Sequence, residues 1–282
     1  MARRRTRHKT PYDANDSRPF QLSRGGVEDY TRCPACFWLR RVKGVPFPGM
    51  PGFNLNIATD LLLKREFDVY REKQEPHPFM VKHGVSHLVP FKHEHLELWE
   101  KALTYYKPNH FNFTHKPSNI LMGGGLDDVW HNRQTNQIHI VEYKSTSTGV
   151  QSPKKEPQPL NRKSLNGIYK IGYTRQLEMY QFIARGMGFD VNDTTYFVYV
   201  DAKHYNEDRM LTEDNDGRLN FEAYFIEYEG EADWVANTLM EIRELLDRDE
   251  CPKHKPSLGK KYCENERFLK RATKELNYFI DR

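Results

Sequence analysis

Long hydrophobic runs are missing from this 282-residue sequence. No segment approaches the roughly 18 consecutive apolar residues that a membrane-spanning helix needs. The basic start, MARRRTRHKT, also has no apolar segment behind it of the kind that a secretory leader requires. We therefore expect a soluble, cytoplasmic protein that has no membrane partner. Hydrophobic residues at 38% and aromatic residues at 13% are enough to build a folded core.

Cysteine is also scarce, and the four that occur sit near the two ends of the chain: Cys33, Cys36, Cys251 and Cys263. A reducing compartment disfavours disulfides, which leaves metal binding or plain packing as small apolar side chains. A Cys-x-x-Cys pair can grip one ion, and four thiolates suffice for Zn²⁺ or an iron–sulfur cluster. His254 is a further candidate ligand for such a site.

A large excess of charge is missing as well, since the formal net charge is only +4. The basic residues are unevenly spread, and several crowd the first nine positions. We interpret residues 1–20 as a disordered basic tail. Such a tail is compatible with a polyanionic partner, and equally with a solvated chain end that binds nothing.

The periodicity of apolar residues alternates between helix and strand, without an internal repeat. It predicts helices over 23–30, 54–72, 93–106, 171–188 and 231–249, and a basic helix that closes the chain. It predicts a hairpin within 118–145 with its turn at 132–137, and strands at 193–203 and 219–229. The side chains expected to point inward are Ile57, Leu61, Leu62 and Val69, then Leu96, Trp99 and Leu103, then Leu177, Tyr180 and Ile183. This order predicts one α/β domain over 21–282, with a mixed central β-sheet flanked by helices.

The segment IHIVEYKS, residues 138–145, ends a predicted buried strand with two charged residues. Side chains alternate across a strand, so Glu142 and Lys144 point to the same face. Asp127 on the preceding strand can approach them across the hairpin. Two neighbouring carboxylates repel each other unless a cation neutralises them, and oxygen ligands suit Mg²⁺ or Mn²⁺. The alternative interpretation is an ordinary ion pair at a strand end.

Three other features surround this strand end. Glycines 123–125 allow the backbone to approach a ligand or a neighbouring strand closely. Gln176 and Tyr180 lie four residues apart, so they share one face of a predicted helix. The segment 146–167 is a long polar loop, which is usually functional. Its basic residues, which we interpret as candidate nucleic-acid contacts, are Lys154, Lys155, Arg162 and Lys163.

Taken in order, GGLDDVW, IVEYKS and QLEMY resemble the motif series of the PD-(D/E)XK nucleases, in their RecB-like exonuclease branch. The N-terminal LSRGGVEDYTRCPACFWLRRVKG is similar to the opening of that branch. The resemblance covers roughly residues 22–200. It implies a restriction-endonuclease-like core and a metal-dependent deoxyribonuclease of exonuclease type. It also implies DNA as substrate and a separate helicase or repair protein as partner.

The resemblance assigns a role to each matching residue. Asp127, Glu142 and the backbone carbonyl of Tyr143 would bind Mg²⁺ or Mn²⁺, and Lys144 would position or activate the attacking water. Gln176 would orient the lysine or a phosphate, and Tyr180 would contact the nucleic acid strand. Asp128 is the alternative to Asp127, but the spacing from the glycine favours Asp127.

The sequence departs from the family pattern in two places. Many relatives carry a metal-binding histidine on an early helix, which is missing here, and Asp60 or Glu66 could replace it as a second-metal ligand. Some relatives hold a [4Fe-4S] cluster with one N-terminal and three C-terminal cysteines, whereas this chain has two of each. A catalytically silent nucleic-acid-binding subunit of a nuclease complex is therefore the alternative function. A structural protein whose acidic strand ends merely pair with lysines is a third.

Overall fold

A computed structural model describes residues 11–47, 52–148, 159–167, 170–204, 210–211, 213 and 216–280. The helices are α1 (Arg24–Arg32), α2 (Pro34–Arg41), α3 (Asn54–Lys73), α4 (Pro78–Lys82), α5 (Leu96–Trp99), α6 (Ile171–Gly186), α7 (Trp234–Leu246) and α8 (Glu264–Ile280). The strands are β1 (Phe20–Ser23), β2 (Leu88–Pro90), β3 (Asn112–His115), β4 (Ile120–Gly123), β5 (Asp128–Asn132), β6 (Ile138–Thr146), β7 (Thr194–Ala202) and β8 (Phe221–Glu229). Among these residues, no helix is long and apolar enough to cross a membrane.

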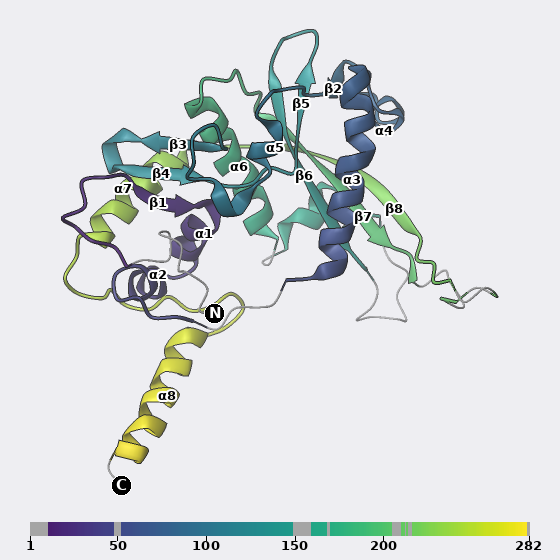
Figure 1. Cartoon of the computed structure of the whole chain (residues 1–282). Helices are drawn as coiled ribbons and strands as arrows, with labels where there is room; N and C mark the ends of the chain where they lie inside the picture. Colours follow the sequence, from purple (N-terminus) through teal and green to yellow (C-terminus); the bar gives the residue numbers. More distant parts are fainter. Residues whose placement is uncertain are drawn as a thin grey trace, which may run out of the picture.

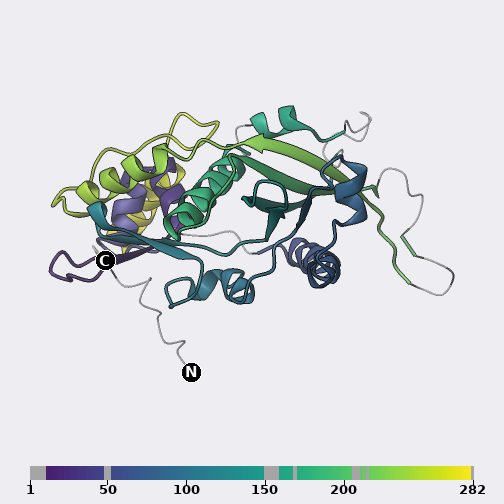
Figure 2. The same cartoon turned by 90° about the horizontal axis from the view of Figure 1, so that it is seen from above.

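The strands form two sheets, with orders β2-β5-β6-β7-β8 and β1-β4-β3. Within the larger sheet β6 pairs antiparallel with β5 and parallel with β7. Parallel neighbours need a crossover connection, and α6 supplies it between β6 and β7. Figure 1 shows α3 along the larger sheet, and α1, α2 and α7 beside the smaller one; Figure 2 shows the same division from above. The predicted mixed α/β architecture with flanking helices is confirmed.

The predicted hairpin is present, but its first strand is divided. β5 and β6 pair antiparallel, with Asp128 opposite Val141, and β7 and β8 match the two other predicted strands. β4, which the sequence analysis joined to β5, belongs to the smaller sheet. The chain changes sheets at residues 124–127, so the glycines and Asp127 lie at the junction.

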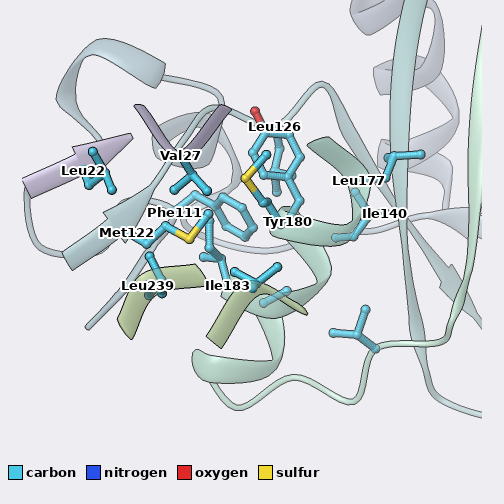
Figure 3. Close-up of a cluster of buried hydrophobic side chains, with 14 of the residues drawn as sticks. Leu22, Val27, Phe111, Met122, Leu126, Ile140, Leu177, Tyr180, Ile183 and Leu239 are labelled. Carbon is cyan, nitrogen blue, oxygen red and sulfur yellow. The ribbon is translucent and has the colours of Figure 1, made fainter. Parts of the chain in front are cut away.

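A single buried cluster joins the two sheets. Figure 3 shows its side chains gathered together, and they include Leu22 and Met122 from the smaller sheet and Ile140 from the larger one. The inward residues predicted for α6, namely Leu177, Tyr180 and Ile183, are all buried in this cluster. A shared core of this kind supports the expectation of one domain.

Helix α1 begins and ends where local chemistry requires. The Ser23 side chain accepts a hydrogen bond from the Gly26 N–H at 3.2 Å and caps the helix. Cys33 is extended, with φ −160°, because Pro34 disfavours helical backbone in the residue before it. Pro34 then opens α2 at its first position, where a missing N–H costs nothing.

Helix α3 occupies the predicted residues but buries a different side, so the predicted inward face is wrong. The four residues predicted to point inward, Ile57, Leu61, Leu62 and Val69, are all exposed. Its buried side instead carries Thr59, Phe67 and Arg71. Arg71 donates to the buried carboxylate of Asp128 at 2.7 Å, so a charge faces the sheet where the apolar periodicity predicts a hydrocarbon side chain.

The helix predicted over 93–106 is also wrong in extent. Only α5 and a 3₁₀ turn at 102–104 are helical, and Leu103 is 80% exposed while Leu96 and Trp99 are buried. The backbone leaves the helix after Trp99 and runs against the glycine junction. The Leu126 N–H donates to the Trp99 carbonyl at 3.0 Å, which replaces the next helical hydrogen bond.

Gly125→Ala should lower the free energy of unfolding by about 1–3 kcal/mol. A Cβ at Gly125 would lie 2.8 Å from the Ala102 nitrogen and the Glu100 carbonyl oxygen, both backbone atoms that cannot rotate away. Gly167→Ala is the matched control, since its Cβ would meet nothing nearer than 3.9 Å. Urea denaturation should find that control neutral or stabilised by up to about 1 kcal/mol. Equal effects of the two substitutions would contradict close packing at the junction.

Residues 11–19 correct the extent of the predicted tail. The Tyr12 ring packs edge-on against Phe20 at 5.3 Å between centroids. The Tyr12 N–H donates to the Arg41 carbonyl, and the Tyr12 hydroxyl donates to Asp247. This aromatic anchor holds the second half of the predicted tail against the body, while residues 1–10 lie outside the described residues.

Candidate active site and metal centre

A cavity of about 390 Å³ opens at the end of β6, between α1, α3 and α6. The sequence-predicted residues that line it are Asp60, Asp127, Glu142, Tyr143, Lys144, Gln176 and Tyr180. They come from four separate segments of the chain. The predicted convergence of Asp127, Glu142 and Lys144 on one pocket is therefore confirmed.

Glu142 and Lys144 meet on one face of β6, as strand alternation requires. The Lys144 ammonium donates to Glu142 Oε1, and its Nζ lies 5.0 Å from the centroid of the Tyr173 ring. The second carboxylate oxygen, Glu142 Oε2, is buried and has no hydrogen-bond partner among the described residues. An unsatisfied buried carboxylate oxygen is costly, so this atom calls for a cation or a donor.

Asp127 reaches the cavity from the glycine junction. Its Oδ2 accepts a hydrogen bond from the Tyr143 N–H at 3.0 Å, which fixes the carboxylate beside β6. Burial, and then the charge on Asp127, raises the pKa of Glu142 to about 8. Two carboxylates crowd one cavity, and the Lys144 ammonium offsets only part of that cost.

The adjacent Asp128 points to the other side of the sheet. Its carboxylate accepts from Arg71 and from the Trp130 indole, and from the Tyr143 hydroxyl at 2.5 Å. All of its partners are structural, and it does not line the cavity. The structure therefore favours Asp127 over Asp128 as the site residue. It also shows that the Tyr143 side chain belongs to the far face, so only the Tyr143 backbone can serve the site.

Gln176 and Tyr180 lie at the base of the cavity. The Tyr180 hydroxyl donates to the Gly125 carbonyl at 2.7 Å, and the Gln176 amide donates to that hydroxyl at 3.3 Å. Tyr180 is only 2% exposed. Both residues therefore brace the junction that carries Asp127, and contact between Tyr180 and a nucleic acid strand stays a prediction.

Sequence reasoning missed one cation that lines the cavity and a second that lies beside it, next to Asp60. Arg24, at the start of α1, lines the cavity. Burial lowers the pKa of Arg24, but Tyr180, Glu142 and Asp127 outweigh this effect, and the pKa is raised. Lys64 on α3 donates to the Leu126 carbonyl at 3.2 Å. The only signal for Arg24 in the sequence is its place directly after the capping Ser23.

The two candidate ligands for a second metal ion, Asp60 and Glu66, lie in different surroundings. Asp60 lines the cavity, and burial followed by the charge on Asp127 raises its pKa. Glu66 is 61% exposed and forms an ion pair with His77 at 2.9 Å, so its prediction as a ligand is wrong. The two acidic residues lie on different sides of α3.

The predicted nucleic-acid contacts are only partly described. Lys154 and Lys155 lie outside the described residues. Arg162 and Lys163 are exposed in a 3₁₀ turn over Arg162–Asn166, which Asn161 caps by accepting from the Lys163 N–H at 2.9 Å. Neither lines the cavity, so their contact with a nucleic acid stays a prediction.

A second group of side chains joins the two ends of the chain and could hold a metal ion. The ligand atoms of Cys33, Cys36, His254 and Cys263 all lie within 4.8 Å of one another. A hydrogen bond between the Cys33 and Cys36 thiols is the largest influence on the pKa of each. It lowers the pKa of Cys33 and raises that of Cys36. Cys251 is exposed and lies outside this group, so its prediction as a ligand is wrong and His254 takes the fourth place.

Without a divalent ion, the free energy of unfolding should fall as the pH rises from about 5 to about 8. Folding raises the pKa of Glu142 from its usual 4.5 to about 8, so in this range the folded chain keeps a proton that the unfolded chain has released. One proton corresponds to at most about 1.4 kcal/mol per pH unit.

The Glu142→Gln variant isolates this effect, because the groups whose pKa Glu142 shifts, Arg24, Lys144 and Tyr180, titrate well above pH 8. Urea titrations of both proteins in chelator should show the variant gaining stability over the parent as the pH rises. A difference that is constant from pH 5 to pH 8 would contradict a raised pKa at Glu142.

Comparisons with known proteins add no assignment. No protein-family model matches the chain, and no curated protein matches it in sequence.

Proposed function

We propose that the chain is a metal-dependent nuclease that hydrolyses phosphodiester bonds in DNA, of the PD-(D/E)XK superfamily and its RecB-like branch. The observation that carries this proposal is the cavity shared by Asp127, Glu142 and Lys144, in which Glu142 Oε2 is buried and has no hydrogen-bond partner in the described part of the chain. An acidic pair beside a half-buried lysine at a strand end is costly to build, and a hydrolytic site gives it a use.

The donor set fits a hard divalent cation. Asp127 and Glu142 would hold Mg²⁺ or Mn²⁺, and the Tyr143 carbonyl and Asp60, which belong to the same cavity, are the further candidate ligands. When bound, such an ion lowers the pKa of a water molecule and offsets negative charge on the leaving oxygen. Neutralising the acidic pair would also remove the repulsion that raises the pKa of Glu142.

The protein's own cations would serve the phosphate. Lys144 would hold the attacking water or a phosphate oxygen once its carboxylate partner turns to the cation. Arg24 is half-buried and lines the same cavity, so its guanidinium would be available to a phosphate oxygen. Tyr180 and Gln176 would hold the Asp127 carboxylate in position by bracing the glycine junction. A cytoplasmic location and a separate helicase or repair protein as partner belong to the same proposal.

One observation favours the alternative of a catalytically silent DNA-binding subunit. The Lys144 ammonium bonds directly to Glu142, so the two groups partly satisfy each other without any ion. A retained fold that only binds DNA would keep this ion pair permanently.

Cleavage of end-labelled linear DNA and of circular DNA, single- and double-stranded, separates the two functions. The nuclease should cut with Mn²⁺ or Mg²⁺ and stop when the ions are chelated. Cutting of linear but not circular substrates would identify an exonuclease. Binding without cleavage of any substrate would establish the silent subunit and overturn the proposal.

A further inference from the structure

The spacing of the Cys–His group is specific enough to distinguish between its candidate occupants. His254 Nδ1 lies 3.6 Å from Cys33 Sγ and 3.5 Å from Cys36 Sγ. Cys36 Sγ lies 3.4 Å from Cys263 Sγ. All three cysteines of the group are buried, and all are free thiols.

A single tetrahedral ion requires nearly these separations. Zn²⁺ binds sulfur at about 2.3 Å and nitrogen at about 2.0–2.1 Å, which places two sulfurs about 3.8 Å apart and a sulfur and a nitrogen about 3.5 Å apart. A four-iron cluster interposes several metal atoms between its ligands and needs them farther apart than the 4.8 Å found here. The group is therefore too compact for a cluster and matches one ion.

The surroundings of the group are those of a thiolate site. The Lys255 N–H donates to Cys33 Sγ at 3.3 Å, and a backbone donor of this kind stabilises negative charge on a ligating sulfur. The His254 ring presents Nδ1 to two of the sulfurs, so that atom serves as the ligand. Three thiolates and one imidazole form a closed four-ligand set, which is typical of structural zinc.

We propose that Cys33, Cys36, Cys263 and His254 bind one Zn²⁺ ion, which fastens the C-terminal segment to α1 and α2. Cys36 and His254 are 218 residues apart, so the ion closes a very long loop. The connection from α7 to α8 is irregular over residues 247–263, and the ligands supply its anchor. Figure 1 shows α8 projecting away from the body just beyond this point.

The ion would also act on the cavity through α1. Cys33 caps the C-terminal end of this nine-residue helix, and Arg24 begins it inside the cavity. One face of α1 is already tied to α6, because Arg175 donates to Glu28 at 2.7 Å and 2.9 Å. Metal release would free the other end of the helix, so amide exchange should rise in α1, α2 and residues 250–263 together.

The test measures metal and uses no DNA, so its failure is distinguishable from failure of the proposed nuclease. Untagged protein purified without chelator should contain about one zinc and little iron per chain by mass spectrometry of the metals. After replacement of zinc by Co²⁺, the visible spectrum should show the intense bands of a tetrahedral thiolate site. Iron near four atoms per chain, or no metal with cobalt bands absent, would overturn the proposal.

Two ligand variants and one control variant identify the ligands. Cys36→Ser should lose at least about nine-tenths of the zinc, whereas the matched control Cys251→Ser should keep all of it, because Cys251 lies outside the group. His254→Cys replaces one ligand by another and should retain zinc with a shifted cobalt spectrum. Loss of zinc from Cys251→Ser would show that the sulfur ligands are assigned wrongly. If Cys36→Ser does not fold, the cobalt spectra of the parent and of His254→Cys still decide the question.

Discussion

Lys144→Ala should lower the rate of DNA cleavage by about 10²–10⁴-fold while the fold and most of the DNA affinity remain. The Lys144 ammonium lies in the cavity and pairs with Glu142, which is two residues away in the sequence. Under the proposed function, its removal takes away the group that would position water or phosphate. It contributes little to affinity, because it is one cation among many. Single-turnover cleavage and filter binding measure the two effects separately.

Lys203→Ala is the matched control for this substitution. Lys203 follows the neighbouring strand β7, pairs with Glu222 as Lys144 pairs with Glu142, and has the same 18% exposed side chain. It does not line the cavity, so the control should cleave at the parent rate. If Lys144→Ala cleaves as fast as the control, the strand end is an ion pair and the nuclease assignment of this site is wrong.

Asp127→Asn should lower the rate of cleavage and Asp128→Asn should lower stability, although the two residues are adjacent. Asp127→Asn keeps an oxygen that can accept from the Tyr143 N–H but loses the charge that would bind the cation. Cleavage should fall by at least about 10²–10³-fold with stability unchanged or raised. Asp128→Asn leaves the buried Arg71 guanidinium with only the exposed Asp68 as a charged partner and should cost about 3–5 kcal/mol of stability.

Three measurements separate these outcomes: urea denaturation, Mn²⁺ binding by calorimetry and cleavage below the denaturation midpoint. Asp127→Asn should weaken Mn²⁺ binding together with cleavage, whereas folded Asp128→Asn should retain both. If both variants were fully folded and lost cleavage equally, the metal ligand could not be assigned from the face of the sheet on which each aspartate lies. A folded Asp127→Asn that binds Mn²⁺ like the parent would remove this carboxylate from the site.

Much of the secondary structure could be predicted from the local spacing of apolar residues. The strands β6, β7 and β8 and the helices α1, α3, α6 and α7 follow from apolar spacing, a capping serine and a proline, all of which act within a few residues. The inward face of α6 was predictable because its partners are hydrocarbon side chains. The inward face of α3 was not, since the sheet beneath it carries Asp128 and attracts the guanidinium of Arg71.

The sequence by itself determined that Glu142 and Lys144 share a face, because alternation along a strand is a property of the backbone. Only the tertiary structure decided what joins them there. Arg24 reaches the cavity because the smaller sheet places the start of α1 beside β6. His254 takes the place expected for Cys251 because the irregular C-terminal segment turns that ring toward sulfurs more than 200 residues away. Contacts over such distances depend on how whole elements pack, and no local pattern of residues encodes them.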